Sequence, residues 1–226
     1  MPNQCKQIFD AIVAHDINAL KLTLNSKACL EERDESGRTP LMRASLLGYD
    51  EFVAEILKHN PQLDAADDEG DNPIILAATL DRIGIIRDLV AHGSTVDGRN
   101  ATTGETALMV AAHSASTACV STLLSLGANP NAQNKHGITS LMRAVFGGNV
   151  ETVRTLLQKQ ALIDSRDEKG RTALFHAVAK NRVEISRLLK DSGADPTLKD
   201  VDGLSPRVIA AKAQDAKMRL LFEPTS

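Results

Sequence analysis

The sequence predicts an all-α fold, a solenoid of stacked helix–turn–helix units with projecting finger loops. A glycine recurs at intervals of 33 or 34 residues, at Gly37, Gly70, Gly104, Gly137, Gly170 and Gly203. A helix-capping Thr, Asn or Ser lies two residues after each of these glycines. Two apolar patterns with helical spacing then follow each cap. A fixed period of this length is typical of arrays in which neighbouring units bury each other's apolar faces.

The first helix of each repeat is expected to begin at the capping residue. Proline at the first helical position favours this start in Thr39-Pro40, Asn72-Pro73 and Ser205-Pro206. After the cap, a Leu-x-x-Ala pattern places a large and a small side chain on one face, as in Leu41 and Ala44. The small residue lets a neighbouring helix approach closely.

The second helix carries an apolar face that we expect to form the core. Its residues in successive repeats are Phe52, Val53, Ile56 and Leu57; Ile85, Ile86, Leu89 and Val90; Val120, Leu123 and Leu124; and Val153, Leu156 and Leu157. These helices should end in a left-handed residue at Gly93, Gly127 and Gly193, and Asn60 can adopt the same conformation. Gln160 occupies the equivalent position and predicts local strain.

Two segments carry a resemblance to a known family. Gly37-Arg38-Thr39-Pro40-Leu41-Met42-Arg43-Ala44 and Gly170-Arg171-Thr172-Ala173-Leu174-Phe175-His176-Ala177 resemble ankyrin repeats, and the resemblance covers nearly the whole chain. It implies a single ankyrin-repeat domain over residues 1–226. The expected parts are an N-terminal capping repeat at 1–36, full repeats at 37–69, 70–103, 104–136, 137–169 and 170–202, and a C-terminal cap at 203–226.

The first and last units are expected to act as caps. The repeat register places Ile8, Ala11, Ile12, Leu20 and Leu24 at core positions of the N-terminal unit. In the C-terminal unit Arg207 replaces the leucine found at equivalent positions such as Leu41, which indicates a face in contact with water. A helix over residues 213–222 should close the stack.

The chain departs from the ankyrin pattern in two respects. Apolar residues replace the histidine usual in the family, at Met42, Ile75, Met109, Met142, Phe175 and Val208. The array should therefore depend more on packing and less on hydrogen bonds between repeats. The finger at residues 98–104 holds one residue more than its equivalents, so its tip should protrude or bend; the alternative is loop variation without consequence.

Composition excludes several classes of partner and location. A formal charge of -3, an aromatic content of 3% and the absence of Trp argue against binding nucleic acid. No apolar run approaches the roughly 20 residues that span a bilayer, and the first residues do not resemble a signal peptide. We therefore expect a cytoplasmic protein without a membrane partner. The three cysteines, Cys5, Cys29 and Cys119, are expected to be reduced and mostly buried.

The sequence offers no catalytic or metal-binding motif. Its six histidines are scattered over different repeats, and it contains neither a phosphate-binding loop nor a nucleophile elbow. Cys119 lies on the apolar face of a second helix, which favours a structural thiol. The acidic residues around Asp68 lack the spacing of a calcium loop. We expect no enzyme activity, no metal site and no cofactor.

By resemblance to the family, binding is expected at the finger tips and on the first helices, which line a concave groove. The first-helix candidates are Arg43, Leu46, Leu47, Leu76, Leu80, His113, Arg143, Phe146, His176 and Lys180, and the finger candidates are Asp68, Glu69, Asp71, His136, Ile138 and Arg171. Large apolar residues beside cationic ones are typical of protein interfaces. The alternative is that the apolar candidates point inward and enlarge the core.

These features predict a non-catalytic module, monomeric by itself, that binds a partner protein. One alternative is a regulatory or inhibitory subunit that occludes an enzyme's site, and another is a bacterial effector that acts on host proteins. The fingers differ in charge, with Asp68 and Glu69 in an early finger and Lys135 and Lys169 in later ones. If the fingers present a charge gradient, a partner with a basic patch toward the N-terminal side should associate faster; the alternative is an acidic loop that is simply solvated.

Overall fold

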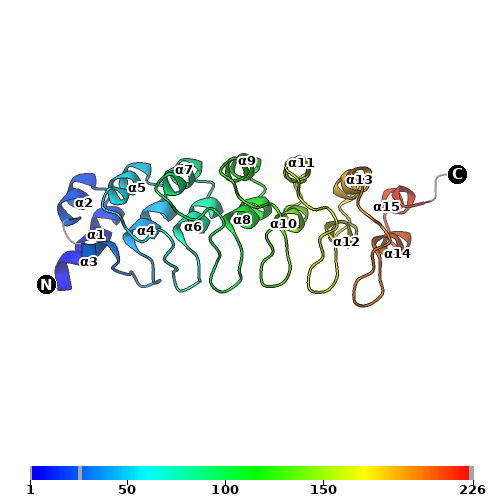
Figure 1. Ribbon diagram of the computed structural model, residues 1–226, viewed down its shortest axis with the longest axis horizontal. Helices are drawn as coiled ribbons and strands as arrows, with labels where there is room; N and C mark the ends of the chain where they lie inside the picture. Colours follow the sequence, from blue (N-terminus) through cyan, green and yellow to red (C-terminus); the bar gives the residue numbers. More distant parts are fainter. Residues whose placement is uncertain (1, 25–26, 224–226) are drawn as a thin grey trace. The chain divides into compact units, whose positions relative to one another are not determined.

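The computed structural model describes residues 2–24 and 27–223, which form α-helices joined by turns and loops (Figure 1). The chain divides into two compact units, Met1–Ala107 with Ser125–Ala128, and Leu108–Leu124 with Asn129–Ser226. The prediction of a single domain therefore stays a prediction, and each unit is described by itself. In the first lie α1 (Pro2–Val13), α2 (Ile17–Thr23), α3 (Lys27–Leu30), α4 (Pro40–Leu47), α5 (Asp50–Leu57), α6 (Pro73–Thr79) and α7 (Ile83–Ala91).

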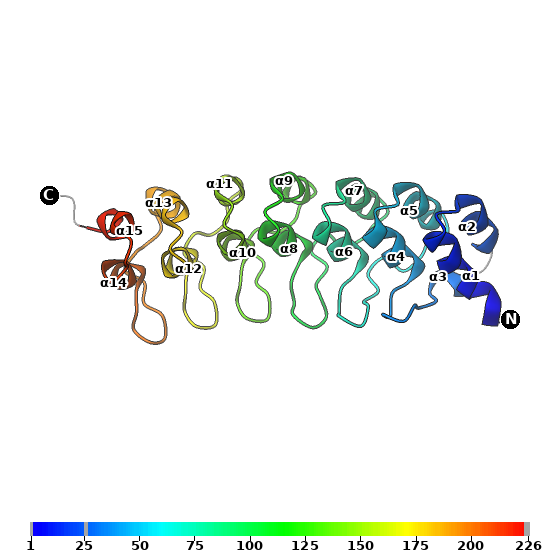
Figure 2. The same ribbon diagram turned by 180° about the vertical axis from the view of Figure 1, so that it is seen from behind.

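The second unit contains the later helix pairs, beginning within α8. These helices are α8 (Ala107–His113), α9 (Thr117–Ser125), α10 (Ser140–Gly147), α11 (Val150–Gln158), α12 (Ala173–Ala179), α13 (Val183–Asp191), α14 (Pro206–Ala211) and α15 (Ala216–Leu221). Within each unit the first helices of the repeats form one layer and the second helices another (Figures 1 and 2). The fingers extend beyond the layer of first helices.

The predicted capping residues begin the first helices. In each case the side-chain oxygen accepts the backbone N–H three residues later, at Thr39, Asn72, Thr139, Thr172 and Ser205. These bonds satisfy a donor that has no partner within the helix. The helix starts expected from the sequence at these residues are confirmed.

Most of the predicted core is buried, although three residues expected there, Val90, Leu124 and Leu157, are only half-buried. All five apolar residues assigned to the N-terminal cap, Ile8, Ala11, Ile12, Leu20 and Leu24, are at most 4% exposed. Apolar residues at the family's histidine position are equally buried in five repeats, at Met42, Ile75, Met109, Met142 and Phe175. Val208, in the last repeat, is 41% exposed. The predicted water-facing side of this repeat is confirmed, since Arg207 is also exposed.

Left-handed residues follow the second helices as expected. Gly93, Gly127 and Gly193 have φ values of 100°, 93° and 95°. Asn60 and Gln160 share the left-handed region with φ values of 53° and 63°. A side chain in this conformation costs roughly 1 kcal/mol, and Gln is not among the residues, Gly, Asn and Asp, that adopt it routinely. The strain predicted at Gln160 is therefore confirmed.

A carboxylate or amide side chain organises each finger, a feature that sequence reasoning did not identify. The residues are Asp34, Asp67, Asn100, Asn134, Asp167 and Asp200, and each accepts two backbone N–H groups of its own turn. Such turns are a common use of Asp and Asn. Backbone bonds then join adjacent fingers, as from Asp68 N to the Ser36 oxygen in the first unit and from Glu168 N to the His136 oxygen in the second.

The longer finger accommodates its extra residue within the Asn100 turn. Asn100 Oδ1 accepts the N–H groups of Thr102 and Thr103, at 2.8 and 2.7 Å. Its Nδ2 donates to the backbone oxygen of Glu69 and to Asp71 Oδ1 in the preceding finger. Hydrogen bonds from Asn100 therefore join the tip of the longer finger to the preceding finger.

The state predicted for two of the three cysteines is wrong. Cys5 and Cys29 form a disulfide, with their Cα atoms 4.6 Å apart. Packing of α1 against α3 brings them together although they are 24 residues apart in sequence. The short helix α3 was not expected, so spacing along the chain could not reveal this proximity. Cys119 is free and buried, as predicted.

Candidate binding surfaces

The second unit presents a cluster of aromatic and cationic side chains, which we call the Phe146 cluster. It comprises Phe146 of α10, His176 of α12 and Lys180 at the C-terminal end of α12. The rings of Phe146 and His176 meet edge to face, with centroids 4.8 Å apart. Lys180 Nζ lies 5.4 Å from the centroid of the Phe146 ring. Phe146 is half-buried and Lys180 is exposed, so a partner can reach both.

A buried carboxylate orients the His176 ring. His176 Nε2 lies 2.8 Å from Asp167 Oδ2, and the two side chains are only 14% and 7% exposed. Asp167 is itself held because its Oδ1 accepts the N–H groups of Lys169 and Arg171. Burial lowers the pKa of His176, although the hydrogen bond to Asp167 acts to raise it. The neutral imidazole is thus favoured at neutral pH.

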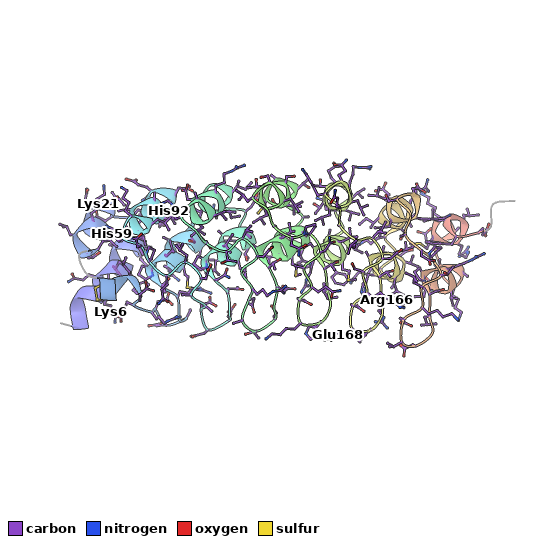
Figure 3. The ribbon with its side chains drawn as sticks, viewed as in Figure 1. Lys6, Lys21, His59, His92, Arg166 and Glu168 are labelled. Carbon is purple, nitrogen blue, oxygen red and sulfur yellow. A yellow bond between two sulfur atoms is a disulfide. The ribbon has the colours of Figure 1, made fainter. Side chains whose placement is uncertain are left out.

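The neighbouring finger residues line a hollow of about 250 Å³ in the second unit. Its lining residues are His136, Ile138, Asp167, Glu168, Lys169, Arg171 and His176. His136 is exposed and its Nδ1 lies 3.2 Å from Oε2 of Glu168, which is labelled in Figure 3. Ile138 is half-buried. These two residues remain accessible to a partner.

Arg171 has a structural role in addition to the predicted surface one. Its Nε lies 3.1 Å from Asp200 Oδ2, and its Nη2 lies 3.6 Å from Asp202 Oδ2. The guanidinium also lies over the buried Phe175 ring, with Cζ 5.0 Å from the centroid. The Arg171 guanidinium is already paired with carboxylates of the next finger. It is therefore a weak candidate for an ion pair with a partner protein.

Two further predicted residues of the second unit differ in accessibility. Arg143 on α10 is half-buried, and burial lowers the pKa of its guanidinium. His113, the last residue of α8, is exposed.

In the first unit, one predicted contact residue is wrong and the others lie at the surface. Leu76 on α6, a helix that packs against α4 and α7, is only 3% exposed. Leu80, at the end of the same helix, is 45% exposed. The predicted alternative, an apolar side chain that enlarges the core, therefore holds for Leu76. Arg43, Leu46 and Leu47 on α4 are half-buried.

The acidic finger of the first unit, around Asp68, contains carboxylates that bond to other residues of the chain and carboxylates that are exposed at its tip. Asp71 Oδ1 accepts a hydrogen bond of 2.6 Å from Asn100 Nδ2, and burial raises the pKa of this carboxyl. Asp67 pairs with Arg38 at 3.0 Å. Asp68 and Glu69 are exposed at the tip. Only these two predicted residues of the finger can therefore meet a partner with their full charge.

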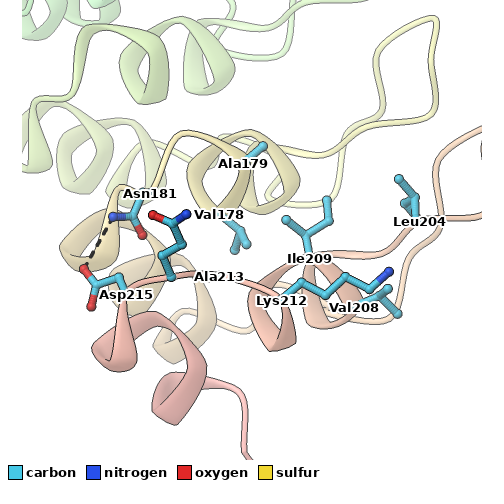
Figure 4. A pocket seen from close by; sticks show the side chains of 10 residues that line it. Val178, Ala179, Asn181, Leu204, Val208, Ile209, Lys212, Ala213 and Asp215 are labelled. Atoms are coloured by element: carbon cyan, nitrogen blue, oxygen red, sulfur yellow. Dashed lines mark hydrogen bonds between the residues drawn. The ribbon is translucent and has the colours of Figure 1, made fainter.

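Sequence reasoning missed an apolar hollow at the C-terminal end of the second unit. The hollow measures about 420 Å³ and is lined by Val178, Ala179, Asn181, Leu204, Val208, Ile209, Lys212, Ala213, Gln214 and Asp215 (Figure 4). Asn181 Nδ2 donates to Asp215 Oδ2 at 3.4 Å across one side of it. The available signal in the sequence was Arg207, which replaces a leucine of the earlier repeats, and the neighbouring Val208 is 41% exposed in the structure.

Comparison with known proteins identifies the family of this chain. A family model described as ankyrin repeats (3 copies) matches residues 8–100, 55–134, 83–167 and 108–200. The chain belongs to the ankyrin-repeat family. Its structure is similar to the crystal structure of the ankyrin repeat domain of Bcl-3, described as a unique member of the IkappaB protein family. The TM-score is 0.85, with 24% identity over 95% of this chain and 96% of the other.

The resemblance between this ankyrin-repeat protein and the Bcl-3 domain concerns the fold alone. No curated protein showed significant sequence similarity. Among residues 2–24 and 27–223, no three His, Cys, Asp or Glu side chains group together in a way that could hold a metal ion. The same residues include no helix with the length and apolar character needed to cross a membrane.

Proposed function

We propose that this ankyrin-repeat protein binds a protein partner through its first helices and finger tips, without catalysis and without a cofactor. Ankyrin repeats are generally protein–protein interaction modules. A formal charge of -3 provides no general attraction for nucleic acid or an anionic membrane. We further propose that the chain is monomeric until it meets its partner.

The Phe146 cluster is the observation that carries this proposal. Partly exposed aromatic rings beside cationic groups often contribute most of the binding free energy at interfaces. Here Phe146 is held by the His176 ring at 4.8 Å, and His176 is held by Asp167 at 2.8 Å. A partner would therefore lose little conformational entropy in ordering these side chains.

The test compares two truncations in the second unit. Phe146→Ala should weaken binding of a purified partner by about 2 kcal/mol, measured by isothermal titration calorimetry. Leu162→Ala is the matched control, because Leu162 is a 62% exposed apolar residue outside the cluster. Equal affinities for Phe146→Ala and the unmodified protein would refute the proposed surface.

The same complex distinguishes a binding module from an inhibitory subunit. If the purified partner is an enzyme, its turnover is measured with and without a saturating amount of this protein. Unchanged turnover supports a binding module alone. A loss of turnover that Phe146→Ala relieves would assign the occluding role to the same surface.

A further inference from the structure

The first unit contains a hollow of about 570 Å³, which is separate from the Phe146 cluster of the second unit. Its lining residues are Lys6, Phe9, Asp10, Val13, Glu32, Arg33, Asp34, Glu35, Ser36 and Arg43. They belong to α1, to the first finger and to α4. We call this feature the N-terminal hollow.

Apolar surface forms one side of the N-terminal hollow. Phe9 and Val13 are one helical turn apart on α1, so their side chains lie on the same face. Phe9 is half-buried and Val13 is 64% exposed. A partner side chain entering the hollow would cover this apolar surface and remove it from water.

The basic residues of the lining are largely engaged within the chain. Arg33 donates to the backbone oxygens of Gly37 and Ala66. Arg43 Nη1 lies 3.8 Å from Asp34 Oδ2. Asp34 also accepts two N–H groups of its own turn, so both members of this pair are held in place. Lys6 is the remaining cation of the lining and is exposed.

Three carboxylates of the lining have no such engagement. The side chains of Asp10, Glu32 and Glu35 are exposed and form no ion pair or hydrogen bond with any residue in the described ranges 2–24 and 27–223. Arg33 bonds only neutral backbone oxygens, so its charge and that of Lys6 offset two of these three carboxylates, and an excess of one negative charge remains around the apolar surface. Exposed carboxylates around an apolar floor attract a side chain that is both aliphatic and cationic.

The second finger adds negative charge at the rim. Asp68 N donates to the Ser36 oxygen at 3.1 Å, which ties the tip of this finger to the lining of the hollow. Gly37, with φ of 71°, makes room for the Asp68 carboxylate, because a Cβ there would lie 2.3 Å from Asp68 Oδ1. The exposed Glu69 follows in sequence.

We propose that the N-terminal hollow receives an arginine, with an adjoining apolar residue, from an extended segment of the partner protein. The aliphatic stem of arginine packs on apolar surface, and its planar guanidinium can bond two carboxylates at once. It can also stack on the Phe9 ring. This inference rests on the proposed protein-binding function but uses the first unit alone. An acidic segment would meet the excess negative charge and is disfavoured.

The test is a titration of the full ¹⁵N-labelled chain with the peptide acetyl-ALRALRA-amide, followed by NMR. The expected result is saturable shifts in the backbone amides of residues 6–13 and 32–43, weakened by added salt. Two peptides serve as comparisons, one with Glu in place of Arg and one with Ser in place of Leu. Both should bind at least about fivefold more weakly, because each lacks one of the two recognised features.

Charge-matched variants locate the site. Glu32→Gln with Glu35→Gln should weaken the peptide by about fivefold, whereas Glu51→Gln with Glu184→Gln makes the same charge change elsewhere and should not. Val13→Ser should also weaken the peptide without unfolding the chain, since Val13 is 64% exposed.

The proposal is overturned if the arginine peptide gives no saturable shifts, if the shifts lie outside these segments, or if both double variants bind equally. Such a result leaves the Phe146 cluster intact, because the cluster is tested by Phe146→Ala against the purified partner. Conversely, a saturable peptide site with unchanged partner affinity in Phe146→Ala would support the hollow and refute only the cluster.

Discussion

The imidazole Nε2 of His176 lies 2.8 Å from Oδ2 of Asp167, so a residue that organises a finger also orients a residue on the proposed binding face of α12. Oδ1 of the same carboxylate holds the finger turn. Finger conformation and the Phe146 cluster are therefore coupled through one side chain.

Asp167→Asn should separate the two roles of this carboxylate. The amide oxygen can still hold the turn, as Asn134 does in the preceding finger, so stability should change by less than about 1 kcal/mol. Loss of the anionic acceptor should lower the pKa of His176 further, measured by NMR titration of its ring. Glu168→Gln removes a neighbouring charge and should leave that pKa nearly unchanged. An unaltered His176 pKa in Asp167→Asn would contradict the coupling.

Stability should fall in acid partly because of His176. Its pKa is lower in the folded chain than the ordinary value of 6.5, so the unfolded chain binds more protons in this range. The contribution is complete above pH 6.5 and is lost as the pH falls below it. The free energy of unfolding, measured with urea at several pH values, should fall less on acidification in His176→Gln than in the unmodified protein. His59→Gln is the control, because His59 is exposed. If stability depends on pH in the same way in the unmodified protein and in both variants, His176 does not contribute to the acid sensitivity.

Gly147→Ala should strongly destabilise the second unit. A Cβ at Gly147 would lie 2.3 Å from the backbone oxygen of His113, and a backbone group cannot move aside as a flexible side chain can. We expect a loss of about 2–3 kcal/mol in thermal or urea unfolding. Gly193→Ala is the control, because nothing lies within 4 Å of its added Cβ and only the left-handed strain of roughly 1 kcal/mol applies. Equal losses at the two positions would contradict the close approach.

Breaking the Cys5–Cys29 disulfide should destabilise the N-terminal cap. Cys5→Ser with Cys29→Ser should lower stability by about 2–3 kcal/mol, because the unfolded chain regains the freedom of the closed loop. Under non-reducing denaturing conditions, only Cys119 should react with a thiol reagent. Three reactive thiols in the purified, unreduced protein would contradict the pairing.

Much of the fold could be predicted because its determinants lie close together in the chain. The capping bond from Thr39 spans three residues, and the same holds for its equivalents in later repeats. The left-handed turn at Gln160 likewise depends on local backbone conformation. The position of the extra residue in the third finger followed from the interval between glycines alone.

The candidate surfaces were less predictable because exposure depends on neighbours that are about 30 residues away. Leu76 on α6 and Leu80 at its C-terminal end are both leucines, yet only Leu76 is buried in the unit where α6 packs against α4 and α7. Arg171 resembles a free surface cation in sequence, but its partner Asp200 is 29 residues further along.

The repeat period, the helix starts and the core positions can be read from the chain because each arises from interactions within a few residues or from strict periodicity. The disulfide, the paired carboxylates and the N-terminal hollow depend on how successive repeats stack. Stacking sets distances between side chains that are remote in sequence, and no local pattern encodes them. The charge that remains free for a partner is therefore a property of the folded array.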